Sequence, residues 1–182
     1  MLLDCQNPPQ RSPAGFILEK AQGSWWVARV LPRQEKALAR DLLRASISYF
    51  LPMYTVVRSS RGRSWKATLP LFPGYVFVCG QEPDRSVALA TGRIATLIAV
   101  HDQAGLVSEL AAILRLTESG LAMDPYPALG RGSRCRVRSG PLQGVEGKVV
   151  RRKCQTRFVV DVTILGQGVT AEIDGSLLEL AD

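Results

Sequence analysis

The chain has 182 residues, of which 46% are hydrophobic and 21% are charged. These proportions are typical of a soluble globular protein and exclude disorder throughout, and the length suffices for one ordinary domain or two small ones. The formal net charge is +7, which favours a polyanionic neighbour such as DNA, RNA or an acidic protein groove. The plainer alternative is that the surplus charge serves only solubility.

The cysteines and the N-terminus exclude further classes. The four cysteines are scattered, with no C-x-x-C pair and no histidine nearby, so neither a zinc site nor a disulfide framework fits their spacing. The first residues lack the basic region and apolar run of a signal peptide, and no segment approaches the ~20 apolar residues that span a membrane. We therefore expect a cytoplasmic protein with reduced thiols, no membrane association, no metal and no cofactor.

The first part of the chain predicts a mixed α/β domain. Residues 1–23, which are rich in proline and glycine with little periodicity, predict a flexible arm. Residues 24–120 predict a domain whose elements alternate between aromatic or β-branched runs and helical periodicity. The expected strands are 25–31, 47–57 with an interruption at Pro52, 68–79 with a bend at Pro73-Gly74, and 94–100; the expected helices are 33–45, 84–90 and 106–119. Residues 58–65 predict a basic hairpin tip. The order strand-helix-strand-strand-helix-strand is that of ferredoxin-like and RNA-recognition folds.

The second part predicts a small all-β domain. Residues 121–129, with Pro125 and Pro127, predict a linker, and residues 130–182 predict five short strands at 135–137, 148–152, 158–163, 169–173 and 177–180. Four glycines stand close together in residues 130–150, at Gly132, Gly140, Gly144 and Gly147. They predict tight turns with positive φ or close backbone approach, and hence a closed β-barrel. A helix there would carry roughly 1 kcal/mol of penalty per glycine and about 3 for Pro141.

Two groups of residues are candidates for binding. Tyr75 and Phe77 alternate on one strand and so share a face, which is either ordinary core or an exposed apolar patch that marks a partner site. Basic residues recur along the first helix, and others occupy the hairpin; the two sets are Arg33, Lys36, Arg40 and Arg44, and Arg58, Arg61, Arg63 and Lys66. They predict phosphate contact or, as the alternative, a solvated face. We interpret the single histidine, His101, as structural. No acid–base pair, phosphate loop or metal cluster points to an enzyme.

Several of these motifs together resemble the NusG family of transcription elongation factors. The glycine-centred stretch 130–150 resembles a KOW element, and Trp25-Trp26-Val27 resembles the opening of the family's N-terminal (NGN) domain. The run 69–78, LPLFPGYVFV, is similar to the most specific strand of that domain, and Gly92-Arg93-Ile94 to the turn before its last strand. Leu51-Pro52-Met53 and the Arg61–Arg63 hairpin resemble the specialised, RfaH-like branch of the family. The resemblance covers residues 24–182 and implies an α+β protein with an NGN domain followed by an SH3-like KOW barrel.

The resemblance implies a monomeric factor that suppresses pausing or termination. Its N-terminal domain would bind the clamp helices of RNA polymerase through Phe72, Tyr75 and Phe77. Non-template DNA would meet the candidate nucleic-acid residues, which are Arg33, Lys36, Arg40, Arg44, Arg61 and Arg63. Positions that match the family's base-reading residues hold Leu31, Ala37 and Asp41, so a different DNA element, or none, would be read. The KOW domain would recruit Rho or a small-subunit ribosomal protein through Ile164, Leu165 and Gly166.

A rival interpretation is a stand-alone RNA-binding KOW protein of ribosome assembly or translation. The strand that carries Phe72 to Phe77 favours the elongation factor, because ribosomal KOW proteins have no such N-terminal domain.

Overall fold

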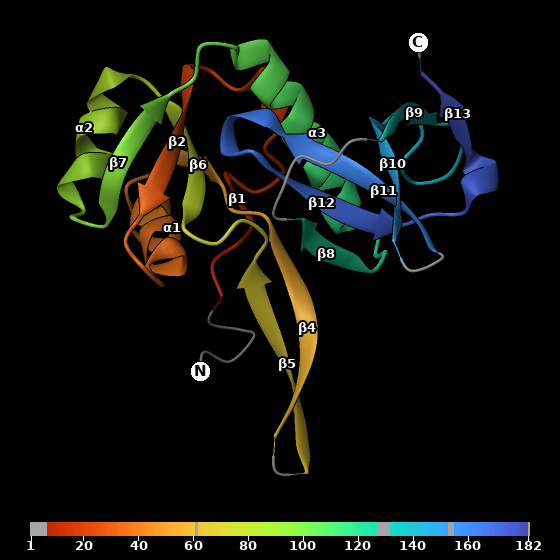
Figure 1. Ribbon diagram of the computed structural model, residues 1–182. Helices are drawn as coiled ribbons and strands as arrows, with labels where there is room; N and C mark the ends of the chain where they lie inside the picture. Colours follow the sequence, from red (N-terminus) through yellow and green to blue (C-terminus); the bar gives the residue numbers. More distant parts are fainter. Residues whose placement is uncertain (1–6, 61, 127–131, 153–154, 182) are drawn as a thin grey trace. The chain divides into compact units, whose positions relative to one another are not determined.

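The computed structural model describes residues 7–60, 62–126, 132–152 and 155–181. The chain divides into two compact units, Met1–Gln103 and Ala104–Asp182. Figure 1 shows the helices and strands of both units.

The first unit is built on a five-stranded sheet. Its strand order is β1-β3-β6-β2-β7, and every pairing is antiparallel. The strands are β1 (Arg11–Ser12), β2 (Ser24–Val30), β3 (Ser48–Phe50), β6 (Tyr75–Gly80) and β7 (Ile94–Ala99), and the helices are α1 (Glu35–Arg44) and α2 (Glu82–Ala90). The chain order β2-α1-β3-β6-α2-β7 therefore confirms the predicted alternation of strands and helices.

The helices cover one face of this sheet. Leu38 and Leu42 of α1 are fully buried and join Val76 and Val78 of β6 in one hydrophobic cluster. The four-residue spacing of these two leucines thus marks the core-facing side of α1. Helix α2 begins with a capping box, in which Gln81 and Asp84 each accept a hydrogen bond from the other's backbone, satisfying two amides that a helix start leaves open.

The N-terminal arm is more ordered than predicted. Residues 11–12 form β1, which extends the sheet beyond β3, and Leu18 in a short 3-10 turn (η2, Leu18–Lys20) is 1% exposed. The Gln10 carbonyl accepts from the Leu51 amide at 2.6 Å, and the Pro9 carbonyl from the Tyr49 hydroxyl at 3.0 Å. The prediction missed β1 because this strand forms only by pairing with the edge of β3, which is distant in the sequence. The proline-rich arm itself has no strand periodicity. Residues 1–6 of the arm lie outside the described residues.

A separate two-stranded ribbon extends from the first unit. It consists of β4 (Met53–Ser60) and β5 (Arg63–Pro70), which pair over their full length. At about 3.3 Å per residue, each strand spans roughly 26 Å. Figure 1 shows the ribbon projecting away from the five-stranded sheet. The hairpin expected at residues 58–65 is confirmed, and so are the interruption at Pro52 and the bend at Pro73-Gly74, which separate the ribbon from β3 and β6.

The second unit contains one antiparallel sheet of six strands, in the order β13-β9-β10-β11-β12-β8. The strands are β8 (Met123–Tyr126), β9 (Ser133–Val137), β10 (Glu146–Arg152), β11 (Gln155–Val162), β12 (Gln167–Glu172) and β13 (Leu178–Leu180). All five strands predicted after residue 130 are present, whereas the closure of the sheet into a barrel stays a prediction. Helix α3 (Gln103–Glu118) groups with this unit from Ala104 onward, although we had assigned it to the N-terminal half.

Part of the expected linker is a strand. Residues 123–126 form β8 at the edge of the sheet, where Pro125 lies opposite Val169 of β12. An edge strand tolerates a proline because only one of its sides has to donate hydrogen bonds. In the sequence the two prolines argue against a strand, so the prediction assigned the segment to a linker. Residues 127–131 lie outside the described part of the chain.

The glycines of residues 130–150 have the two predicted uses. Gly140 has a φ of 90° in the turn between β9 and β10, which disfavours a side chain. Gly147 instead permits close approach, because a Cβ there would stand 2.7 Å from the Phe158 ring and against the Val159 carbonyl oxygen.

Candidate polymerase and nucleic-acid interfaces

A buried carboxylate fixes the bend that precedes β6. Glu35, in the first turn of α1, is 8% exposed, and its Oε1 accepts a hydrogen bond from the Gly74 amide at 2.8 Å. The Gly74 carbonyl accepts from the Val30 amide at 2.8 Å, and Gly74 has a φ of 84°. The start of β6 is therefore tied to both α1 and β2. Sequence reasoning missed Glu35, whose only signal was an acidic residue near a helix start.

The aromatic residues around this bend are mostly core. Phe77 is fully buried, stacks on Phe50 with 6.4 Å between ring centroids, and meets Phe72 edge-on at 6.0 Å. Phe72 is 2% exposed as well. Of the two alternatives for the face shared by Tyr75 and Phe77, ordinary core therefore holds for Phe77, and an exposed patch does not. The phenylalanine rings stabilise one another by burial and by favourable ring geometry. Tyr75 alone is half-exposed, and the role of the three residues in binding polymerase stays a prediction.

The predicted basic stripe on α1 is partly engaged in internal contacts. Lys36 donates from Nζ to the Asn7 side chain and to the Thr68 carbonyl, each at 2.6 Å, so it joins the arm, the helix and the ribbon. Arg44 pairs with Asp41 at 2.8 Å, and the same Asp41 pairs with Arg93 at 2.5 Å. Arg33 is exposed just before the helix, and Arg40 lies half-buried on it. The structure thus gives Lys36 a structural role, and DNA contact by the stripe stays a prediction.

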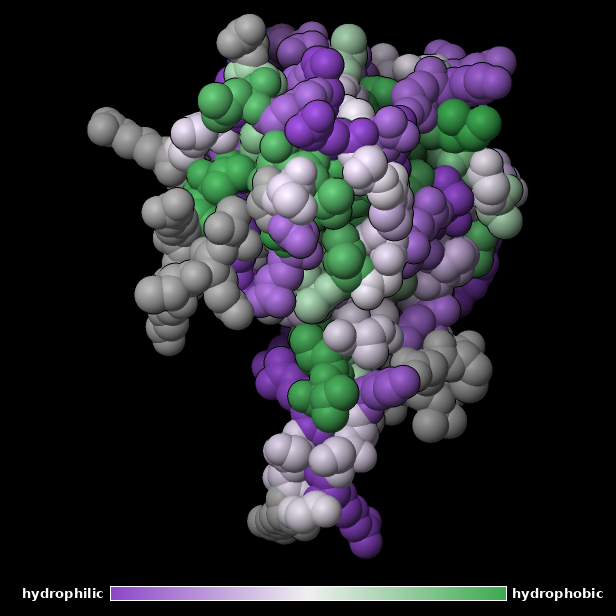
Figure 2. Space-filling view, turned by 90° about the vertical axis from the view of Figure 1, so that its right-hand side faces the viewer, coloured by the Kyte–Doolittle hydropathy of each residue, from purple (hydrophilic) through white to green (hydrophobic). Residues whose placement is uncertain are grey.

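The ribbon presents two different faces. Because side chains alternate along a strand, one face holds the register pairs Tyr54 with Leu69, Val56 with Ala67, Arg58 with Trp65, and Ser60 with Arg63. We call it the Trp65 face. The other face carries Val57, which is 72% exposed, opposite Lys66. Figure 2 shows hydrophobic side chains on the upper part of the ribbon and hydrophilic ones toward its tip. Arg61 lies outside the described residues.

The predicted partner loop of the second unit forms a short turn. Ile164 and Leu165 are half-buried in η3 (Thr163–Leu165), and Gly166 ends the turn with a φ of 62°. Glu109 of α3 accepts from the Thr163 amide at 3.1 Å and from the Thr163 hydroxyl at 2.5 Å. The structure therefore brings an α3 carboxylate to this loop, which the sequence did not reveal. Partner binding here stays a prediction.

Cross-strand ion pairs offset part of the positive charge of the second unit. Arg136 pairs with Glu146, and Arg157 pairs with Glu172 at 3.1 Å, in both cases directly across the sheet. The hydrogen bond and charge of Arg136 lower the pKa of the Glu146 carboxyl. Solvent screening leaves such surface pairs little net effect on folding, so they set local charge more than stability.

The thiols that the structure describes are unreactive groups. Burial, with a smaller contribution from Asp84, raises the pKa of Cys79 to about 11, and burial also raises the pKa of Cys135. Both therefore stay protonated at neutral pH. Among the described residues, no three His, Cys, Asp or Glu side chains gather as a metal site would require. No helix among the residues that the structure describes is long and apolar enough to cross a membrane.

Comparison with known proteins identifies the first part of the chain. Residues 23–112 match the protein family "NusG: Transcription termination factor nusG". A solved structure described as "Crystal Structure of MjSpt4:Spt5 complex conformation B" is also similar. The alignment covers 87% of this chain and 97% of the chain in that structure, at 15% sequence identity and a TM-score of 0.30. A structural similarity with so low a TM-score supports no conclusion about this chain. No curated protein sequence matches the chain. The family match extends from the residue before β2 into α3, so the chain contains a NusG-family domain at residues 23–112.

Proposed function

We propose that this protein is a transcription elongation factor that binds RNA polymerase through its NusG-family domain and suppresses pausing or termination. The observation that carries the proposal is the match of residues 23–112 to the NusG family. The matched region includes four of the five strands of the sheet, β2, β3, β6 and β7, and the Phe-Pro-Gly-Tyr motif at the start of β6. Its resemblance to the RfaH-like branch supports an operon-specific antiterminator rather than a housekeeping factor.

In this proposal Tyr75 is the side chain that contacts the polymerase clamp helices. It is the half-exposed residue of the aromatic group, directly after the bend held by Glu35 and Val30. Phe72 and Phe77 act beneath it, since their buried rings fix the position of β6. An aromatic side chain on a rigid strand is well suited to a protein interface, because little side-chain freedom is lost on binding.

The basic residues would hold the DNA of the elongation complex. Three of them are exposed: Arg33 just before α1, Arg44 at the end of α1, and Arg63 in β5 of the ribbon. Contacts from such residues to phosphates add affinity without reading sequence. Non-template DNA is the ligand that the family resemblance implies for this region.

The second unit would recruit a further partner of the transcription or translation machinery. Ile164, Leu165 and Gly166 form the proposed contact loop, in an SH3-like KOW barrel built from the strands after residue 130. A small-subunit ribosomal protein or Rho is the partner proposed there. The predicted helix penalty of the glycine-rich segment supports a stable β form of this half.

The direct test is a single-round transcription assay on a template with a strong pause, using purified polymerase of the source cell. The wild-type protein is expected to shorten the pause, and Tyr75→Ala to remove most of that effect while the circular-dichroism spectrum stays native. Val87→Ala is the control, because it truncates a 48% exposed side chain on α2 of the same unit, away from the proposed contacts. A Tyr75→Ala protein that acts like wild type would refute the assigned contact, and a wild-type protein that leaves every pause unchanged would refute the proposed function.

A further inference from the structure

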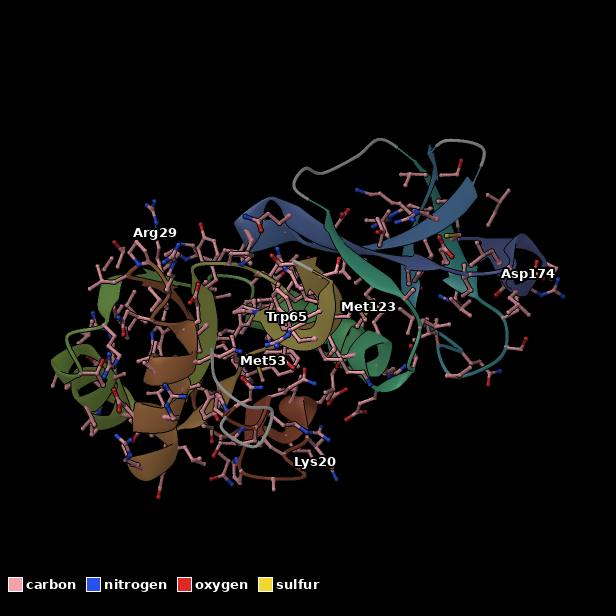
Figure 3. The ribbon with its side chains drawn as sticks, turned by 90° about the horizontal axis from the view of Figure 1, so that it is seen from below. Lys20, Arg29, Met53, Trp65, Met123 and Asp174 are labelled. Atoms are coloured by element: carbon pink, nitrogen blue, oxygen red, sulfur yellow. The ribbon has the colours of Figure 1, made fainter. Side chains whose placement is uncertain are left out.

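The ribbon carries a tryptophan that is not among the buried core residues. Trp65 lies in β5, in a sheet of only two strands, and remains partly exposed. The opposite face of the ribbon is itself open to solvent, as the 72% exposure of Val57 shows. Figure 3 views the unit from the side toward which the ribbon projects and labels Trp65 on it. A large aromatic ring in such a position is a candidate for binding rather than for packing.

The surroundings of Trp65 are basic on one side and small on the other. Arg58 lies directly opposite it across the ribbon, and Arg63 lies two residues away on the same face. Toward the base of the ribbon the neighbours on this face are Val56 and Ala67, whose side chains are much shorter than the ring. The Trp65 face therefore combines a stackable ring with two guanidinium groups at its outer end.

The charge of the ribbon is of one sign. Residues 53–70 contain four arginines and lysines and no aspartate or glutamate. Within the described residues, Arg58 and Arg63 form no ion pair, whereas Arg44 and Arg93 in the same unit pair with Asp41. An unpaired basic surface is complementary to a polyanion and not to a basic or neutral partner.

We propose that the Trp65 face binds an unpaired DNA strand, with one base stacked on the Trp65 indole and the adjoining phosphates held by Arg58 and Arg63. Aromatic stacking combined with a basic track is the physical basis of single-strand binding without sequence preference. Duplex DNA cannot stack a base on the Trp65 indole in this way, because its bases are already stacked on one another. The inference rests on the proposed function, since an elongation complex supplies the unpaired non-template strand.

The test measures binding of the full-length protein to fluorescein-labelled 12-nucleotide oligonucleotides by fluorescence anisotropy. One oligonucleotide is oligo-dT, and the second has the same phosphates but abasic sugars in its central positions. The variants are Trp65→Ala, Trp65→Phe, Arg58→Ala and Lys66→Ala. The last is the matched control, because it removes one positive charge from the neighbouring register position on the opposite face.

Trp65→Ala is expected to weaken binding to oligo-dT by roughly 5- to 100-fold, and Trp65→Phe to recover most of the loss. On the abasic oligonucleotide the wild-type and Trp65→Ala proteins are expected to bind equally. Arg58→Ala should weaken binding to both oligonucleotides and reduce the salt slope by about 1, with a smaller loss for Lys66→Ala.

Three results would overturn the proposal. They are unchanged oligo-dT binding by Trp65→Ala, an equal loss on both oligonucleotides, and tighter binding of duplex DNA or of the matching RNA. Native melting temperatures for Trp65→Ala and Trp65→Phe separate a binding defect from unfolding. Because no polymerase is present, this result is independent of the pause assay, so the stacking site and the proposed function can fail separately.

Discussion

Replacing Glu35 with alanine is expected to destabilise the first unit by about 2 kcal/mol. The carboxylate is 8% exposed and accepts from the Gly74 amide at 2.8 Å. A hydrogen bond to a charged group contributes roughly 1.5–3 kcal/mol, and a buried amide left without an acceptor costs about 1–3 kcal/mol. Burying the carboxylate has a desolvation cost that offsets part of this gain, so the middle of these ranges is the expected value.

Two further variants separate the contributions at this bend. Glu35→Gln keeps an acceptor oxygen and is expected to cost about 1 kcal/mol or less, since only the charge is lost. Gly74→Ala is expected to cost about 1–2 kcal/mol from backbone conformation alone. Gly74 has a φ of 84°, and a Cβ there would have no atom within 4 Å, so steric overlap adds nothing.

Urea unfolding followed by circular dichroism gives the free energies, and hydrogen exchange of the Gly74 amide reports the bond itself. Glu82→Ala is the control, because its side chain is 71% exposed in a surface pair with Arg85 and should cost under about 1 kcal/mol. The reasoning is refuted if Glu35→Ala costs no more than Glu82→Ala. It is also refuted if the Gly74 amide exchanges at the same rate with and without the carboxylate.

Three other outcomes are expected. Gly147→Ala should destabilise the second unit by about 1–3 kcal/mol in urea, because its Cβ would stand 2.7 Å from the Phe158 ring; a neutral effect would contradict the register of β10 and β11. Lys36→Ala should speed hydrogen exchange in residues 7–12 and leave α1 protected, since Lys36 bonds both the arm and the ribbon; unchanged exchange would contradict that role. Burial raises the pKa of Cys79 from 9.0 to about 11 and that of Tyr49 from 10.0 to about 12, so the folded state keeps protons that the unfolded state has lost. Stability should then be full below pH 9 and fall toward pH 12. Cys79→Ala should make the fall that begins near pH 9 shallower, with Tyr49 still contributing above pH 10; an equally steep fall in that variant would contradict the assignment.

The elements that the sequence predicted well are those with a local cause. Leu38 and Leu42 mark the buried side of α1 by their spacing alone, and the turn at Gly140 follows from a residue that tolerates positive φ. The break at Pro52 and the hairpin at residues 58–65 followed from a proline and a glycine within those segments. Each of these signals lies within a few residues of the structure that it predicts.

The parts that the sequence did not predict depend on distant partners. The ordered arm needs the edge of β3, 37 to 39 residues further along the chain by the register Arg11 with Phe50 and Ser12 with Tyr49. From the sequence alone, Glu35 and Glu109 would be expected to be solvated surface residues. Only the fold brings Glu35 to Gly74 and Glu109 to Thr163. The burial of Phe77 likewise could not be told from exposure by alternation, because alternation assigns a residue to a face and not to what covers that face.

The most direct test of the central claim is site-specific photo-crosslinking of the full-length protein to RNA polymerase. A photoreactive phenylalanine analogue replaces Tyr75 in one protein and Val87 in a control, because Val87 is 48% exposed on α2 and has no part in the proposed contact. The account predicts a crosslink from position 75 to the clamp helices of the largest polymerase subunit and none from position 87. No polymerase crosslink from position 75, or one to a different polymerase element, would contradict it.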